Sequence, residues 1–362
     1  MKALIISNPF KGTISSKDIG NTISYALRNK GISSLSIPST DGGDGFLDAF
    51  SYIDKEAIIK TYKVKFLDKE IDANYLLNER LKTAYLSLSD TCGIKYLSKK
   101  ERDPMNIGLY PLGLLMRYII ENEHVSQIKI GIGGSPSIDL GAGFLEGLGV
   151  KFYDKNNNLI HNLCNSKLKL IDKVDTSYID NLIKDVIIVC LKDVNCRIIR
   201  NGACDSYALT KGARTSDIPT IRENAKAFIN MTKSIKGNMV KDSKYFGAAG
   251  GLAFSLFYYL HASLVSGAEE FLKCIRIDGL LKEYDLVITG EGAYDNQTSQ
   301  GKLINAIKKH RPKKLIIVCG INRSNKKKNI YSIVPDVASH KESMYNPKEC
   351  LIRLIDIIDF NK

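Results

Sequence analysis

Short apolar runs alternate with amphipathic stretches at both ends of the chain. The first run, residues 3–7, precedes a stretch from Ser15 or Ser16 to about Lys30 whose apolar residues recur every three or four positions. Such a run is typical of a buried strand, and such a spacing is typical of a helix, here capped by a serine. Near the other end of the chain, the pattern predicts strands at 286–289 and 315–320 and helices at 303–309 and 347–360. This alternation predicts a parallel sheet covered by helices.

The middle of the chain follows a different pattern. Polar and apolar residues alternate at 58–66, 70–76 and 83–88, which predicts antiparallel strands joined by short turns. Beyond them we expect a helix from Pro104 to about Glu121, strands at 126–132 and 186–191, and a long helix from 247 to about 261. The predicted fold is therefore α/β: a discontinuous Rossmann-like or flavodoxin-like parallel-sheet domain, residues 1–60 plus 282–362, with a large inserted mixed α/β domain, residues 61–281.

Composition narrows the class of protein. The 362 residues are 44% hydrophobic and carry a net charge of +13, but their lysines are scattered, tryptophan is absent, and no basic run is interleaved with stacking aromatics. We therefore expect anionic small molecules rather than nucleic acid as partners. Eight cysteines without a CxxC pair and five histidines without metal-site spacing indicate a reduced, cytoplasmic protein with no structural zinc. The apolar runs are too short to span a membrane.

The richest candidate chemistry follows the strand predicted at 286–289. That strand breaks into Gly290-Glu291-Gly292, after which come Asp295, Gln297 and a Gly-Lys pair ending in Lys302. Small residues let a backbone approach a ligand, carboxylates hold a metal or a proton, and lysine neutralises phosphate. Open α/β sheets bind ligands at such strand ends. The alternative is a tight turn with solvated charges.

Other predicted strand ends carry similar groups. Lys11 lies in the loop after the first strand, and Asp41 opens a glycine-rich loop, residues 41–45, after the second. The glycine-rich segment 133–143 exposes successive backbone N–H groups that can hold an anion, although it matches neither GxxxxGK[ST] nor GxGxxG. Asp193 follows the strand at 186–191, where a helix cap or turn is an equally good interpretation.

Taken together and in order, these segments resemble the bacterial glycerate kinases of type I. The similarity spans nearly the whole chain and is carried by SNPFKGTIS (7–15), STDGGDGF (39–46), IGIGGSPSIDLGAG (130–143), DVNCRI (193–198), GAAGGL (247–252) and TGEGAYDNQTSQGK (289–302). The resemblance implies ATP- and Mg²⁺-dependent phosphorylation of D-glycerate, typically at the 2-hydroxyl. It also implies two domains with the active-site cleft between them.

The resemblance also implies which residues act. Lys11 is a candidate for neutralising the transferred phosphate, and Asp41, Asp193 and Asp295 are candidates for binding metal or accepting the substrate proton. We expect Asp193 and Asp295 to bind Mg²⁺. The candidates for binding substrate or phosphate share positions in these strand-end loops: Gly42, Gly43, Gly133, Gly134, Ser135, Asp139, Gly290, Glu291, Gly292, Gln297 and Lys302.

The chain departs from the family pattern on the side that would bind the acceptor. Ala293 stands where the family has an arginine, and the segment 102–113 lacks the family's paired hydroxyls. An arginine can clamp an anion with two hydrogen bonds, which alanine cannot do. Two alternatives therefore stay open: a relative that binds nucleotide or metabolite without turnover, and a kinase for another small hydroxy acid. The sequence predicts no oligomeric state.

Overall fold

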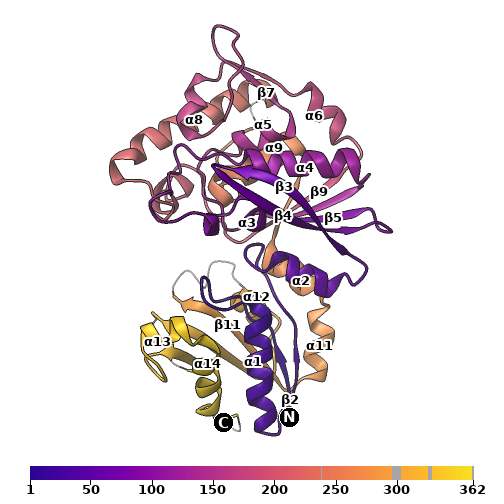
Figure 1. Cartoon of the computed structure of the whole chain (residues 1–362), viewed down its shortest axis with the longest axis vertical. Coiled ribbons are helices and arrows are strands. Elements are labelled where there is room, and N and C mark those ends of the chain that lie inside the picture. The colour runs from indigo at the N-terminus through magenta and orange to yellow at the C-terminus, as the bar shows by residue number, and fades with distance from the viewer. Residues whose placement is uncertain (238, 296–302, 325–327, 361–362) are drawn as a thin grey trace. The chain divides into compact units, whose positions relative to one another are not determined.

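The computed structural model describes residues 1–237, 239–295, 303–324 and 328–360, and the chain forms two compact units (Figure 1). The first unit comprises residues 1–55 and 266–362, and the second comprises residues 56–265. These boundaries differ from the expected ones, chiefly because residues 266–281 belong to the first unit. Phe271 and Leu272 pack into the same core as Leu4 and Val287, so the segment before residue 282 completes the first unit.

The first unit is built on a five-stranded sheet in which every pairing between neighbours is parallel. In the order β13-β12-β11-β1-β2, the strands are β13 (Ile330–Val334), β12 (Leu315–Asn322), β11 (Leu286–Tyr294), β1 (Lys2–Ile5) and β2 (Ser33–Ser36). The central register pairs Ala3 with Leu286 and Ile5 with Ile288. Strands β1, β11 and β12 are apolar on both faces, as a parallel sheet covered on both sides requires.

Helices cover both faces of this sheet. The helices of the unit are α1 (Ser16–Asn29), α2 (Phe46–Ile53), α10 (Gly267–Cys274), α11 (Ile277–Glu283), α12 (Leu303–Lys309), α13 (His340–Tyr345) and α14 (Pro347–Asp356). Helices α1 and α14 lie side by side and share a core with Ile5 and Val318 (Figure 1). Helices α10, α11 and α12 pack on the opposite face against Leu4 and Val287. The terminal helix is shorter than predicted and ends at Asp356.

The strand order reverses between β1 and β11. From β1 the chain passes through α1 to β2 on one side, and from β11 it passes through α12 to β12 on the other. In open α/β sheets, ligands bind outside the carboxyl ends of the strands at such a point. The doubly wound α/β fold that the sequence predicted is confirmed for this unit, and its reversal point indicates where to look for a site.

The second unit contains a mixed six-stranded sheet and a two-stranded one. Its strands are β3 (Ile58–Phe66), β4 (Lys69–Asn78), β5 (Thr83–Ser87), β6 (Gln127–Gly131), β7 (Lys151–Tyr153), β8 (Lys173–Asp175), β9 (Ile187–Lys192) and β10 (Ser263–Ser266). The large sheet has the order β10-β9-β6-β5-β4-β3. Strands β3, β4 and β5 are antiparallel neighbours, as the alternating pattern predicted, whereas β5, β6 and β9 are parallel.

Two predicted helices of the second unit differ in the structure. The helices here are α3 (Leu88–Cys92), α4 (Tyr110–Asn122), α5 (Ala142–Leu148), α6 (Ser177–Leu182), α7 (Ala208–Thr210), α8 (Ile218–Lys236) and α9 (Leu252–Leu260). Helix α4 begins six residues after Pro104, and the helix expected from residue 247 begins at Leu252. A short left-handed turn precedes α9 because the backbone of Gly250, at φ +69°, presses against Ser137. A Cβ at Gly250 would lie 1.9 Å from the Ser137 carbonyl oxygen.

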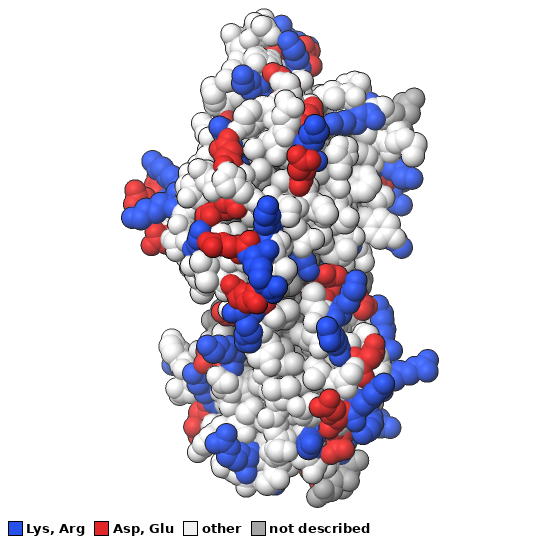
Figure 2. All heavy atoms as spheres, turned by 90° about the vertical axis from the view of Figure 1, so that its right-hand side faces the viewer, with Lys and Arg blue, Asp and Glu red and all other residues white. Residues whose placement is uncertain are grey.

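The charged surface is mixed rather than one-signed on the face that Figure 2 shows. Basic and acidic side chains are interspersed there. Arg80 and Glu56 form an exposed ion pair, with Nε 2.6 Å from the carboxylate. Within the described ranges, no helix has the length and apolar character needed to cross a membrane.

Candidate functional site

In the first unit, the candidate site lies where the strand order reverses, and its floor consists of closely packed backbone segments. Just past β1, the Asn8 amide donates to the Gly290 carbonyl oxygen of β11 over 3.0 Å. On the other side of β11, a Cβ at Gly290 would lie 2.2 Å from the Val318 carbonyl oxygen of β12. Gly290 is therefore required for close strand packing, which explains its place in the predicted motif without any contact to a ligand.

Asp41 is brought to this edge by a serine that the sequence analysis treated only as a helix cap. The Ser16 hydroxyl donates to the Ser7 carbonyl oxygen over 2.6 Å and accepts from the Ser39 amide over 2.8 Å. It thus ties the end of β1 to the end of β2. The Asn8 side chain then donates from Nδ2 to Asp41 Oδ2 over 3.0 Å. The carboxylate is half-buried and its orientation is set by Asn8.

Lys11 lies at the tip of a tight turn next to β11. Phe10 and Ile14 exchange backbone hydrogen bonds of 3.0 and 3.1 Å, and Gly12 closes the turn at φ +73°. The turn lies against Gly292, where an added Cβ would be 3.5 Å from the Lys11 amide nitrogen. The Lys11 side chain is exposed. An exposed cationic residue therefore lies beside the Gly-Glu-Gly segment, as phosphate neutralisation requires.

Buried polar atoms line the same strand ends. Glu291 is 6% exposed and Thr289 is fully buried. Within the described part of the chain, Asn8 Oδ1 and Thr289 Oγ1 are buried with no hydrogen-bond partner. Leaving such atoms unsatisfied is costly, so they are usually explained by a ligand, water or ion. Asp295, at the end of β11, is half-buried.

The first unit therefore brings together Lys11, Asp41 and the segment 290–292 at one edge of the sheet, and Asp295 directly follows the end of β11. Gly42 and Gly43 are buried in the Asp41 loop, where the Thr40 hydroxyl accepts from the Gly42 amide over 3.0 Å. Gln297 and Lys302 lie outside the described residues. Asn8 was not among the predicted site residues, because an Asn-Pro pair is typical of a turn. Its contact with Asp41 shows that it also orients that carboxylate.

In the second unit, Asp139 organises the glycine-rich loop after β6. It is fully buried, and its carboxylate accepts from Ser137 Oγ at 2.8 Å, the Gly141 amide at 3.2 Å and the Gly143 amide at 3.0 Å. Burial raises the pKa of this carboxyl, while the three hydrogen bonds oppose the rise. These contacts favour a role in holding the loop over direct contact with a ligand.

The first part of this loop has more access to ligands. Gly134 is half-buried, and its carbonyl oxygen accepts from the Ile94 amide over 2.8 Å. Gly133 and Ser135 are buried, and Ser135 Oγ accepts from the Ser137 amide over 3.3 Å. The loop follows the carboxyl end of β6, next to the end of β9 where Asp193 begins its own loop. The two loops therefore lie at neighbouring strand ends.

Two buried lysines flank this region, and both were missed from the sequence. Lys211 donates from Nζ to the Ser137 carbonyl oxygen over 2.8 Å. Burial lowers its pKa to about 8, while the charges of Asp139 and Asp193 oppose the shift. Lys192 is 6% exposed, and burial lowers its pKa as well. For Lys192 the sequence did contain a signal: this lysine ends an apolar strand and directly precedes the candidate Asp193.

Arg102 is a further missed residue beside the same loop. Its Nε is buried and has no hydrogen-bond partner among the described residues. A Cβ at Gly212 would lie 2.6 Å from the Arg102 carbonyl oxygen, so the arginine's backbone lies against the segment that follows Lys211. The Pro104 carbonyl oxygen accepts from the Ile138 amide over 3.3 Å. A guanidinium with an Nε donor that has no partner among the described residues is suited to a carboxylate or phosphate.

The described residues contain no group of three or more His, Cys, Asp or Glu side chains placed to hold a metal ion. Mg²⁺ bound together with a nucleotide needs only one or two carboxylates, because phosphate oxygens and waters supply the other ligands. Asp193 and Asp295 are half-buried carboxylates at strand ends, and each fits such a partial ligand set.

The comparisons with known proteins agree with this architecture. The model of the glycerate kinase family matches residues 3–359. A glycerate 2-kinase of Escherichia coli K12 is 29% identical, covering 86% of this chain and 84% of its own. A glycerate kinase of Halalkalibacterium halodurans is 34% identical, covering 74% and 70%. The crystal structure assigned to glycerate kinase 2 of Salmonella typhimurium LT2 superposes with a TM-score of 0.76 at 25% identity, covering 98% and 97%. The chain belongs to the glycerate kinase family and is a kinase.

Proposed function

We propose that the protein transfers the γ-phosphoryl group of ATP directly to the 2-hydroxyl of D-glycerate, giving 2-phosphoglycerate and ADP. The observation that carries this proposal is the Asn8–Asp41 pair at the strand-order reversal of the first unit. It supplies an oriented carboxylate beside the buried, unpartnered Asn8 Oδ1, at the edge where α/β sheets bind ligands. Membership of the glycerate kinase family supports the reaction class.

In this reaction Asp41 accepts the proton of the attacking hydroxyl. The hydroxyl oxygen forms a bond to the γ-phosphorus as the bond from that phosphorus to the leaving ADP oxygen breaks. Asn8 holds one oxygen of Asp41, so the carboxylate meets the substrate in a fixed orientation. Lys11 neutralises negative charge on the transferred group, and its exposed turn lets it follow that group.

We propose further roles for residues of the second unit. Arg102, with its unused Nε donor, binds the carboxylate of glycerate, and Lys211 and Asp139 hold the glycine-rich loop in shape. The backbone of Gly133, Gly134 and Ser135 binds phosphate or carboxylate oxygens. Asp193 and Asp295 would hold Mg²⁺, which would supply positive charge to neutralise the phosphates.

One observation favours a different acceptor. Ala293 pairs with Ile321 in the sheet and is half-buried, so the position where the resembling family has arginine carries only a methyl group. A bulkier or less charged hydroxy acid would fit such a position better than glycerate does. The loss of this arginine also motivates the alternative hypothesis that the protein binds nucleotide without turnover.

The test is a coupled ADP-release assay with ATP, Mg²⁺ and D-glycerate, with ³¹P NMR of the product to separate a secondary from a primary phosphate ester. Asp41→Asn should lower kcat by about 10²–10⁴-fold, the usual contribution of a general base. Asp48→Asn, an exposed aspartate of α2, is the matched control and should leave kcat unchanged. If only another hydroxy acid is phosphorylated, the acceptor is wrong; if none is, the chain is a binder without turnover.

The proposed function also implies a cellular compartment and a set of partners. Six of the eight cysteines are buried, which suits a reducing cytoplasm. The partners are ATP and a small hydroxy acid, and neither nucleic acid nor membrane takes part. Equal turnover by the purified protein with and without added nucleic acid or lipid vesicles would support this, and stimulation by either would contradict it.

A further inference from the structure

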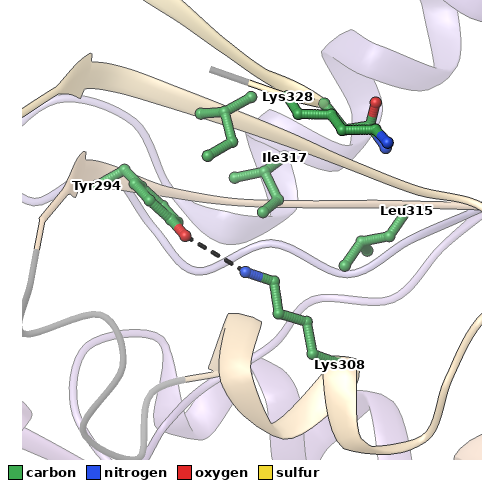
Figure 3. A pocket seen from close by; sticks show the side chains of 7 residues that line it. Tyr294, Lys308, Leu315, Ile317 and Lys328 are labelled. Carbon is green, nitrogen blue, oxygen red and sulfur yellow. Dashed lines mark hydrogen bonds between the residues drawn. The ribbon is translucent and has the colours of Figure 1, made fainter. Parts of the chain in front are cut away.

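A pocket of about 320 Å³ lies on one face of the sheet of the first unit, near its β13 edge (Figure 3). Its wall is formed by Tyr294, Lys308, Leu315, Ile317, Asn329 and Ile330. Its volume is within the range of small-molecule sites in proteins, which begins at roughly 300 Å³. None of these residues was a candidate site residue, although Tyr294 lies within the segment 289–302 that carries the family resemblance.

The pocket exists because the connection from β12 to β13 is short. Only seven residues, 323–329, link these parallel strands, and none of the described ones, 323–324 and 328–329, is helical. Parallel neighbours are normally joined by a dozen or more residues that include a helix. Right-handed connections from β11 onward place their helices on the face that α12 covers. None of the described residues of this connection forms the helix that would pack on this part of the sheet.

The chemistry of the wall suits a flat aromatic ligand. Tyr294 is 5% exposed, and Lys308 donates from Nζ to its hydroxyl over 3.3 Å, which fixes the ring at the side of the pocket (Figure 3). Ile317 is 3% exposed and, with Leu315, supplies an apolar floor. Asn329 offers an amide with both donors and an acceptor, as the edge of a nucleobase requires.

The rim of the pocket is cationic. Lys308 and Lys328 both line it and both are exposed. A ligand that stacks on Tyr294 and carries phosphates is therefore favoured over a neutral aromatic one. Inorganic phosphate or glycerate would use these lysines but leave the tyrosine and the isoleucines without a partner.

The pocket is also connected to the candidate site through one strand. Tyr294 directly precedes Asp295 and follows Glu291 by three residues, a span of about 10 Å along a strand. Thr289, whose hydroxyl has no partner in the described part of the chain, pairs with Ile317 and therefore lies on the same face as the pocket. A ligand bound here can reach the carboxyl edge of β11 with a flexible, charged extension.

We propose that this pocket binds the base and sugar of the purine nucleoside triphosphate that donates the phosphoryl group, with the triphosphate leading to the edge of β11. The proposal rests on the proposed function for the identity of the donor. Tyr294 stacks on the base, Asn329 hydrogen-bonds its edge, and Lys308 and Lys328 bind the first phosphates.

The experiment measures binding and turnover separately on the full chain. The probes are ADP, adenosine and inorganic tripolyphosphate, titrated by calorimetry into wild type, Tyr294→Ala and Lys308→Gln. Loss of a stacking tyrosine should weaken ADP and adenosine about tenfold. Lys308→Gln, on the exposed end of α12, should weaken ADP with little risk to folding. Lys309→Gln is the matched control, because this neighbouring lysine pairs with Glu269 and does not line the pocket.

The outcomes separate the two proposals. ADP binding that depends on Tyr294, without turnover of glycerate, supports the pocket and overturns the proposed reaction. Turnover with unchanged ADP affinity and unchanged KM for ATP in Tyr294→Ala and Lys308→Gln overturns the pocket alone. In Tyr294→Ala, loss of tripolyphosphate binding with adenosine binding intact also overturns it, since the pocket would then be a phosphate site. A rise in KM for ATP, with KM for glycerate unchanged, supports both.

Discussion

Replacing Lys211 with methionine should change how the stability of the protein depends on pH. Methionine is close to lysine in length but carries no charge and cannot donate to the Ser137 carbonyl oxygen, which lysine contacts at 2.8 Å. The loss of that hydrogen bond lowers stability at every pH, and the removal of a buried charge raises it where the lysine is protonated. The sign of the total change in the free energy of unfolding is therefore less informative than the way this change varies with pH.

The magnitude of the slope follows from the pKa of Lys211, which is lowered from 10.5 to about 8 by burial in the folded protein. Between these values the unfolded chain binds a proton that the folded protein does not, so stability rises with pH. Below pH 8 both states are protonated, and the lysine lowers the free energy of unfolding by about 3 kcal/mol relative to a neutral amine. By pH 9.5 this penalty shrinks by about 2 kcal/mol.

The assay is urea unfolding of wild type and Lys211→Met at pH 7 and pH 9.5, followed by circular dichroism and fitted with one transition for each unit. Wild type should gain about 2 kcal/mol more than the variant between the two pH values. Other groups, Lys192 among them, titrate in both proteins and cancel in the difference. Lys226→Met, which removes an exposed lysine of α8, should behave like wild type. If the free energy of unfolding changed between the two pH values by the same amount in wild type and Lys211→Met, within about 0.5 kcal/mol, the conclusion that Lys211 is buried and weakly basic would be refuted.

Three substitutions test the packing that positions the candidate site. Gly290→Ala should cost about 1–3 kcal/mol in urea unfolding, because its Cβ would lie 2.2 Å from the Val318 carbonyl oxygen, whereas Gly279→Ala, in an open position on α11, should be neutral or stabilising. Ser16→Ala should cost about 2–4 kcal/mol, since two buried backbone groups lose their partner; a change below about 0.5 kcal/mol would contradict this. Asp139→Asn should raise the rate of backbone amide hydrogen exchange in the glycine-rich loop, because the asparagine side chain cannot accept all three hydrogen bonds. Unchanged exchange would show that the loop keeps its conformation without these bonds.

The sheet and the strand-end loops of the first unit could be predicted from the sequence, because their signals are local. A run such as 286–289 is apolar on both faces and then breaks into glycine, which few structures other than a buried strand end satisfy. The helices of residues 266–281 were assigned to the wrong unit because an amphipathic pattern shows which face is buried, not against what. The left-handed turn at Gly250 escaped for the same reason: its cause is the backbone of Ser137, more than a hundred residues away.

The sequence by itself determined the alternation of strands and helices, the strand ends that carry Lys11, Asp41 and Asp193, and the family to which their order points. Only the tertiary structure decided that Asn8 orients Asp41, that Lys211 is a buried amine, and that a pocket opens beside Tyr294. The difference is physical. Periodicity and turn chemistry act over a few residues, whereas hydrogen-bond partners and desolvation depend on strand order and on which distant segments pack together.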